Sequence, residues 1–158
     1  MFVVETDGER ADALAIRRAV FVDEQGVDES IEVDDHDDPA ADATHFVAYD
    51  DGDVVGAARL RGVSDAALRA APADDDPTAK VERVAVAADR RGEGWGRRIM
   101  TAVETRARER DFGRIVLHAQ TSVRSFYVEL GYHAHGEEFE EAGIPHVEMT
   151  KTLSRNCS

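Results

Sequence analysis

A strand-like run that leads into a glycine-rich loop and then into a helical pattern constrains this chain most. Residues 80–87, with Val-Glu-Arg-Val-Ala-Val inside them, have the β-branched composition of a strand. Three glycines follow, and apolar residues then recur at every fourth position from Trp95 to Ala107. That spacing predicts an amphipathic helix over residues 94–111, which Gly113 ends. Strand, loop and helix in this order indicate a domain of mixed α/β class.

Other local signals predict the rest of the elements. Thr6 and Glu9 have capping-box spacing, so a helix is expected from about residue 8, with Gly26 ending it or the turn after it. Asp51-Gly52 predicts a hairpin between two strands. A buried strand, a second amphipathic helix that ends at Gly131 and a last strand follow. The expected strands span residues 45–49, 54–61, 115–119 and 146–153, and the expected helix spans residues 123–130.

Two polar stretches are expected to be loops. Residues 28–44 are rich in Asp, and residues 62–79 are rich in Ala, Asp and Pro, with a short helix expected at 64–71. The order of elements predicts an α/β (α+β) fold with a largely antiparallel sheet. Residues 1–153 are expected to form a single domain, and residues 154–158 a C-terminal tail.

Composition excludes several classes of protein. Lys+Arg number 19 and Asp+Glu number 33, for a net charge of −14, which disfavours binding to nucleic acid or to an anionic membrane surface. The one cysteine rules out a disulfide scaffold. No long apolar run predicts a membrane span and residues 1–10 do not resemble a secretory signal, so a cytoplasmic location is expected. The acidity is interpreted either as steering of a cationic substrate or as the composition of a salt-adapted protein.

The glycine loop has the chemistry of an anion site. Glycines let an anion approach backbone N–H groups, and the helix that follows adds unpaired N–H groups and a partial positive charge. Four arginines surround it, at positions 90, 91, 97 and 98. The loop lacks the Gly-Lys-Ser/Thr of a P-loop and the glycine spacing of a dinucleotide fingerprint. A pyrophosphate would suit this loop; a solvated arginine cluster on an ordinary turn is the alternative.

The same residues resemble a known family. Arg-Gly-Glu-Gly-Trp-Gly, residues 91–96, is similar to the Gln/Arg-x-x-Gly-x-Gly/Ala motif of the GNAT superfamily of N-acetyltransferases. Residues 117–120 and 125–132 are similar to its next strand and helix, with Gln120 in place of Asn and Tyr132 in place of Phe. Residues 20–27 and 139–146 resemble the ElaA-like branch.

The resemblance implies an enzyme that transfers an acetyl group from acetyl-CoA to a primary amine of a small molecule or peptide, in a ternary complex without a metal. It implies a GNAT-like sheet flanked by about four helices, with strands splayed at the acyl-CoA site. A homodimer is left open. The alternative function is a non-catalytic acyl-CoA-binding regulatory module, which would not depend on Tyr127 or Glu82. A generic α/β interaction domain is disfavoured by the arginine cluster.

Site residues follow from the resemblance, position by position. Tyr127 is the candidate general acid, with a place in the core as the alternative. Glu82 is the candidate base, with an ion pair to Arg83 or Arg59 as the alternative. The acyl-CoA contacts fall on Val84, Ala85, Val86, Arg91, Gly92, Glu93, Gly94, Trp95, Gly96, Arg97 and Gln120. The residues expected to line the acceptor site are Phe21, Glu24, Gln25, His118 and His146.

Three further interpretations concern charged side chains. His118 and His146 are alternative bases, because an imidazole titrates near neutral pH; a satisfied place within the sheet is the competing interpretation for each. The carboxylates of Glu24, Glu140 and Glu141 are candidates for attracting a cationic amine. His36 lies in an Asp-rich run without defined ligand spacing, so no metal site is expected there.

Overall fold

The chain divides into two units that each contain strands and helices, and the boundaries fall within strands β3 (Asp53–Val63) and β4 (Thr78–Val86) and within helix α3 (Trp95–Glu109). The computed structural model describes residues 2–4, 6–27, 43–63 and 77–153. Unit 1 comprises residues 1–61 and 82–103, and unit 2 comprises residues 62–81 and 104–158.

Unit 1 contains an antiparallel arrangement of strands. Its hydrogen-bonded order is β1 (Phe2–Val3), β2 (Ala43–Asp50), β3 (Asp53–Val63) and β4. The predicted hairpin is confirmed, because β2 and β3 pair antiparallel up to Asp50↔Asp53 around a two-residue turn. Asp51 and Gly52 both have positive φ, 50° and 85°, as a tight hairpin turn requires.

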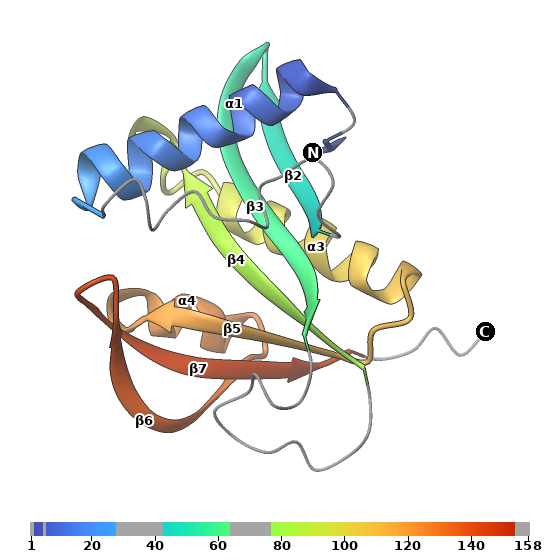
Figure 1. Cartoon of the computed structure of the whole chain (residues 1–158), viewed down its shortest axis with the longest axis vertical. Helices are drawn as coiled ribbons and strands as arrows, with labels where there is room; N and C mark the ends of the chain where they lie inside the picture. The colour runs from blue at the N-terminus through green and yellow to red at the C-terminus, as the bar shows by residue number, and fades with distance from the viewer. Residues whose placement is uncertain (1, 5, 28–42, 64–76, 154–158) are drawn as a thin grey trace. The chain divides into compact units, whose positions relative to one another are not determined.

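The first helix covers one face of these strands. Helix α1, Asp7–Arg17, starts at the predicted capping box: Thr6 Oγ1 accepts from Glu9 N, and Glu9 Oε1 accepts from Thr6 N, both over 3.1 Å. Helix α1 lies across β2 and β3 (Figure 1). Its Ala13 packs into a small core with Val47 of β2 and Ala57 of β3. A π-helical segment η1, Arg18–Glu24, continues α1, and Gly26 follows with φ +72°.

The predicted helix after the glycine loop is α3, Trp95–Glu109. In the part of α3 that belongs to unit 1, Trp95, Ile99 and Val103 form a buried apolar stripe. Gly56 of β3 lets this helix approach closely. A Cβ at Gly56 would lie 2.5 Å from Ile99 Cδ1 and 2.8 Å from the Ala85 carbonyl oxygen.

Unit 2 contains a mixed set of strands. The hydrogen-bonded order is β4, β5 (Arg114–Gln120), β7 (Ile144–Thr152) and β6 (His133–Glu141). β4 and β5 run parallel from Thr78↔Arg114 to Val81↔Leu117, whereas β7 is antiparallel to both β5 and β6. Helix α4, Arg124–Glu129, follows the 3-10 turn η5, Thr121–Val123, and packs against β5 and β6. The mixed α/β, largely antiparallel fold class is confirmed.

Two strands escaped the sequence patterns. β6 reads His-Ala-His-Gly-Glu-Glu-Phe-Glu-Glu and is mostly exposed, so it lacks the apolar alternation of a half-buried strand. β1 is two residues long, too short for any periodicity. β1 and β6 are the two end strands of the order, and an end strand pairs with only one neighbouring strand.

Several predicted boundaries were wrong. Ala43–Thr44, Gly62–Val63 and Thr78–Ala79 belong to strands and not to loops, because ladder hydrogen bonds extend past the apolar runs. α3 ends at Glu109 with Asp111 at φ +65°; Gly113 instead bonds from N to the Pro77 carbonyl over 2.9 Å.

The second predicted helix also differs in one detail. Its first expected apolar residue, Val123, lies in the 3-10 turn and is 42% exposed. The predicted stop at Gly131 is confirmed, since this residue follows α4 with φ +97°. His36, the short helix expected at 64–71 and the tail 154–158 lie outside the described residues.

Candidate functional site

The loop between β4 and α3 presents open backbone. Gly92 and Gly94 have φ of +83° and +87°, and a Cβ at either would meet nothing within 4 Å. The first hydrogen bond into α3 runs from Arg98 N to the Gly94 carbonyl over 3.1 Å. The N–H groups of residues 95–97 therefore have no acceptor within the helix. This is the backbone geometry that an anion needs at a helix N-terminus.

Two of the four loop arginines are held by carboxylates. Arg90 pairs with Asp50 and, over 3.0 Å, with Glu93, and these hydrogen bonds raise the pKa of its guanidinium. Arg91 forms a two-pronged ion pair with Glu24, one contact being 2.9 Å, and also donates to the Val86 carbonyl over 3.2 Å. The hydrogen bond from Arg91 lowers the pKa of Glu24.

The other two arginines are differently placed. Arg97 and Arg98 are exposed on the first turn of α3, and neither forms an ion pair with the described residues. The Arg98 guanidinium lies 4.3 Å from the ring centroid of Trp95, a cation–π geometry. Trp95 Nε1 in turn donates to Glu93 over 3.2 Å. The positive charge available to an anion at this loop thus belongs to Arg97 and Arg98.

The end of β4 has a kinked backbone. Arg83 has φ +58°, which is uncommon for a residue with a side chain. Val84, Ala85 and Val86, the residues expected to bind the acyl-CoA arm, follow this kink directly, and Ala85 is buried. Ala87 N then bonds to the Val55 carbonyl over 2.9 Å. The kink therefore interrupts the regular strand just before the predicted contact residues.

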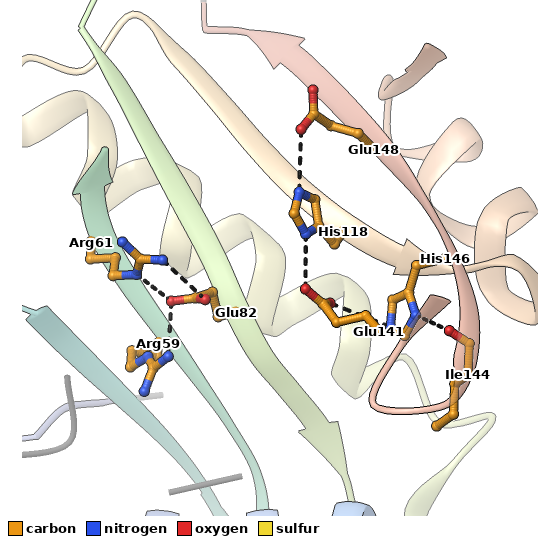
Figure 2. A network of polar contacts seen from close by, with 8 residues as sticks. All are labelled: Arg59, Arg61, Glu82, His118, Glu141, Ile144, His146 and Glu148. Carbon is orange, nitrogen blue, oxygen red and sulfur yellow. Dashed lines mark hydrogen bonds and ion pairs between the residues drawn. The ribbon is translucent and has the colours of Figure 1, made fainter. Parts of the chain in front are cut away.

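Glu82 is an ion-paired carboxylate. It accepts from Arg59 over 2.9 Å and from Arg61 over 2.5 Å. Both contacts are drawn as dashed lines in Figure 2. The Arg59 side chain is completely buried. The ion pair to Arg59 is one of the two alternatives that the sequence left open, and Arg61 is an addition. Two permanent cations hold this carboxylate between β3 and β4, which is the geometry of a structural tie.

Tyr127 is a buried phenol on α4, at 8% exposure. Its ring meets those of Phe126 and Tyr132 edge-to-face, with centroids 5.0 and 5.8 Å apart. Burial raises the pKa of Tyr127 to about 12. The hydroxyl therefore keeps its proton at neutral pH, as a proton donor must.

A second buried tyrosine anchors this region of unit 2. The Tyr132 hydroxyl donates to Glu104 of α3 over 2.9 Å, and Lys151 Nζ donates to the same carboxylate over 2.8 Å. Lys151 also donates to the Leu130 carbonyl over 2.8 Å. Sequence patterns did not predict this network, because its members lie 28 and 47 positions apart and no spacing rule links them.

A cluster of histidines and glutamates lies on one face of β5, β7 and β6. His118 contacts Glu141 through Nδ1 and Glu148 through Nε2, each over 3.2 Å (Figure 2). His146 Nδ1 lies 2.6 Å from the Ile144 carbonyl, and its Nε2 lies 3.7 Å from Glu141. We call these four side chains, His118, Glu141, His146 and Glu148, the His118 cluster. Glu148 was missed from the sequence, although its spacing of two from His146 places both on one strand face.

The predicted site residues fall into both units. The loop residues lie in unit 1, as do Phe21, Glu24 and Gln25 of η1 and its end. Glu24, expected near an acceptor, contacts Arg91 of the loop. Gln120, Tyr127, His118 and His146 lie in unit 2, where Gln120 and His146 are register partners.

The structure describes residues 2–4, 6–27, 43–63 and 77–153. In them, no three His, Cys, Asp or Glu side chains are grouped so as to hold a metal ion. No helix in the same ranges has the length and apolar character to span a membrane.

Comparison with known proteins identifies the class of protein that this fold and loop define. Residues 9–153 match the Acetyltransferase (GNAT) domain family. The chain therefore belongs to the GNAT acetyltransferase family, as its motifs predicted. The Bacillus subtilis protein YyaT is 37% identical over 155 residues, which cover 98% of this chain and 97% of YyaT.

Solved structures give the same result for the fold. An acyl-CoA N-acyltransferase from Pseudomonas aeruginosa superimposes with a TM-score of 0.75 at 27% identity, covering 94% of this chain and 93% of that one. Escherichia coli ElaA superimposes with a TM-score of 0.73 at 28% identity, covering 93% and 92%. The expected likeness to ElaA is confirmed.

Proposed function

We propose that this protein is an N-acetyltransferase that uses acetyl-CoA to acetylate a primary amine of a small molecule or peptide. Membership of the GNAT acetyltransferase family supports an acyl transfer reaction. The observation that carries the choice of donor is the loop before α3. Its two positive-φ glycines are open to an approaching group, and the helix N-terminus carries two exposed arginines. A CoA pyrophosphate is an anion of the size and charge that such a loop accommodates.

The reaction joins an amine nitrogen to the thioester carbonyl carbon. The carbon–nitrogen bond forms, the carbon–sulfur bond breaks, and the CoA thiolate takes up a proton. We assign the donation of that proton to Tyr127, whose buried phenol is protonated at neutral pH. The pairing of Glu82 with Arg59 and Arg61 supports a structural role for that carboxylate, so the proposal leaves removal of the amine proton to another group. No metal takes part in the proposed reaction.

Calorimetric titration of acetyl-CoA into the protein tests the donor. Gly94→Asp is expected to abolish binding, because it adds a side chain and a negative charge beside the open N–H groups. Gly52→Asp is the matched control, since Gly52 has φ +85° and equally open surroundings at the β2–β3 turn. It introduces the same charge and the same backbone strain and should bind as wild type does. A folded wild type that fails to bind acetyl-CoA would contradict the proposal.

An amine panel then separates an enzyme from a regulatory acyl-CoA-binding module. Wild type is incubated with acetyl-CoA and primary amines of alkyl, aromatic and peptide type, and amide products are detected by mass spectrometry. Tyr127→Phe should lower kcat by roughly 10²–10⁴ while acetyl-CoA affinity stays unchanged. Acetyl-CoA binding without any amide product would favour the regulatory module. The cytoplasmic location and the homodimer stay predictions.

A further inference from the structure

His118 occupies an unusual position for an imidazole, between two carboxylates. Its Nε2 faces Glu148 and its Nδ1 faces Glu141, each at 3.2 Å. An ionised carboxylate only accepts hydrogen bonds, so both contacts are hydrogen bonds only when both ring nitrogens carry protons. When the ring is neutral and its proton is on Nε2, the Nδ1 lone pair and the Glu141 carboxylate are two acceptors that face each other. A donor group with two or more hydrogens, placed beside the pair, could donate to both acceptors.

The two sides of His118 differ in access. The Glu148 side chain, in the middle of β7, is 1% exposed, and the Glu141 side chain, at the last residue of β6, is 44% exposed. Glu141 precedes the turn formed by Ala142 and Gly143, both with positive φ. The Nε2 side is therefore the fixed side, and the Nδ1 side opens toward solvent.

Several charged or titratable side chains surround this pair. His146 and Lys80 act on Glu141 together with His118, and the hydrogen bond to His118 is the main reason why the pKa of Glu141 is lowered. His135 Nε2 lies 3.9 Å from Glu148 on the buried side. His146 donates its Nδ1 hydrogen to the Ile144 carbonyl, which leaves its Nε2 toward Glu141. Glu141 is thus ionised at neutral pH and stays at the open end of the cluster.

An aromatic ring borders the same place. Phe139 of β6 meets the His118 ring edge-to-face, with centroids 4.9 Å apart, and stacks on His146 at 6.1 Å. Both contacts limit rotation of the imidazoles. His118 is accordingly held by a ring on one side and by a buried carboxylate at Nε2.

We propose that Nδ1 of His118 and the carboxylate of Glu141 receive the primary ammonium group of the acceptor, and that His118 removes its proton. This inference rests on the proposed function, whose reaction needs a neutral amine. A primary ammonium group has three N–H donors and one positive charge, so it can donate to Nδ1 and to Glu141 together. Glu148 is the positioning residue, which holds the Nε2 proton and stabilises the imidazolium that forms.

The proton balance follows directly. The ammonium gives one proton to Nδ1, and the free amine attacks the thioester carbon. As the carbon–sulfur bond breaks, the CoA thiolate takes a proton from Tyr127. The second proton, which the nitrogen loses in becoming an amide, returns through solvent to the Tyr127 phenolate. His118 then returns its proton to solvent on the exposed Glu141 side. The charges favour His118 over Glu82 as the base. Glu82 lies between two guanidinium groups, which repel an ammonium, whereas His118 lies between two carboxylates.

A binding experiment tests, without any turnover, whether His118 and Glu141 bind an ammonium group. Methylammonium chloride is the probe, because it is the ammonium group alone. Tetramethylammonium chloride is the control at equal ionic strength, because it has the same charge and no N–H donor. Imidazole ¹⁵N resonances are followed by NMR and assigned with the variants His118→Gln and His133→Gln. Methylammonium should shift Nδ1 of His118, tetramethylammonium should not, and Glu141→Gln should weaken the response at least fivefold. An unmoved His118, or equal shifts with both cations, would overturn the proposal.

A kinetic experiment tests proton removal, with the amine that the panel identifies. His118→Gln should lower kcat/KM by roughly 10²–10⁴ and remove the rise of kcat/KM with pH. His133→Gln, an exposed histidine on β6, should behave as wild type. Glu148→Gln should move that rise to lower pH, because the imidazolium loses its counter-charge. A merely structural role would leave the pH profile where it is.

The outcomes separate the two proposals. If His118→Gln retains wild-type kcat/KM and pH profile while amide is still made, His118 is not the base and the acetyltransferase proposal stands. If His118→Gln fails to fold, Glu141→Gln decides, because this exposed change should raise the KM for the amine about tenfold with a smaller effect on kcat. An unchanged KM in that variant would overturn the proposal that Glu141 binds the ammonium group of the acceptor.

Discussion

Tyr132 donates its hydroxyl hydrogen to the buried carboxylate of Glu104 over 2.9 Å, which links the chain just after α4 to the second half of α3. The ring of Tyr132 also meets that of Tyr127 edge-to-face, and Tyr132 N donates to the Tyr127 carbonyl over 3.0 Å. The family pattern that this chain resembles has Phe at this position. The hydroxyl is therefore an addition that ties the candidate general acid's helix into unit 2.

Removing that hydroxyl should destabilise the protein. Tyr132→Phe leaves the ring contact with Tyr127 but takes one donor from a buried carboxylate, which costs about 2 kcal/mol in the free energy of unfolding. Urea denaturation measures this loss. Tyr49→Phe is the matched control, because Tyr49 donates to the more accessible Asp12 over 2.7 Å and should lose less. Equal losses in both variants would contradict the importance of burial at Glu104.

The tyrosines should resist ionisation in alkaline solution. Burial and the hydrogen bond to Asp12 raise the pKa of Tyr49 to about 12, and burial raises that of Tyr127 to about 12. Burial and the charge of Glu104 raise the pKa of Tyr132 as well. Phenolate absorbance should therefore be nearly absent from the folded protein at a pH of about 10.5 and appear on unfolding.

The sign of the stability change follows from these shifts. A phenol whose pKa is higher in the folded state than in the unfolded state ionises first in unfolded chains. Its stabilising contribution is complete below about pH 10 and is lost as pH rises from about 10 through 12. The free energy of unfolding should fall over that interval, and less steeply in Tyr127→Phe. A tyrosine that titrates near its ordinary pKa in the folded protein would refute this.

Gly56 should not tolerate a methyl group. A Cβ there would lie 2.8 Å from the Ala85 carbonyl oxygen, which is backbone and cannot rotate away. Gly56→Ala should cost about 1–3 kcal/mol in the free energy of unfolding, measured by thermal or urea denaturation. Gly8→Ala, in the first turn of α1, is the control, because its nearest neighbour would be 3.9 Å away. A neutral Gly56→Ala would mean that β3 and β4 separate easily.

The exposed loop arginines, Arg97 and Arg98, should contribute more to acetyl-CoA binding than Arg90 and Arg91. The latter two are paired with carboxylates. Changing Arg97 and Arg98 together to Gln removes charge that no described carboxylate neutralises. Each loss is worth about 1 kcal/mol, or roughly fivefold in Kd, and the remaining binding should depend less on salt. Arg90→Gln, whose charge is already matched by Asp50 and Glu93, should change Kd less than about twofold. Calorimetry at low and high KCl measures both, and the reverse ranking would contradict this assignment.

Salt should stabilise the folded chain. The net charge of −14 makes the folded state repel itself, and screening shortens the range of that repulsion to about 3 Å at 1 M salt. The free energy of unfolding should rise as KCl increases from about 0.1 to 2 M. Equal stability throughout would contradict the interpretation of the composition as salt adaptation.

Local patterns predicted much of the fold because they act within a few residues. The capping box at Thr6 depends on a partner three positions away, and the β2–β3 turn depends on two adjacent residues that accept positive φ. The buried stripe of α3 follows from helical spacing. β6 escaped prediction because an exposed edge strand needs no apolar face, so its existence depends on its pairing with β7.

The features of the candidate site are likewise of two kinds: those that local sequence predicted and those that depend on the fold. By itself, the sequence determined the class of this protein, because a glycine loop between a strand and a helix leaves N–H groups open to an anion and its motif agreed with the family. Only the tertiary structure decided which charges are free and which are paired. Arg91 meets Glu24, 67 positions away, and His118 meets Glu148, 30 positions away. Such contacts depend on strand register and on the path of the chain, and no spacing rule encodes them.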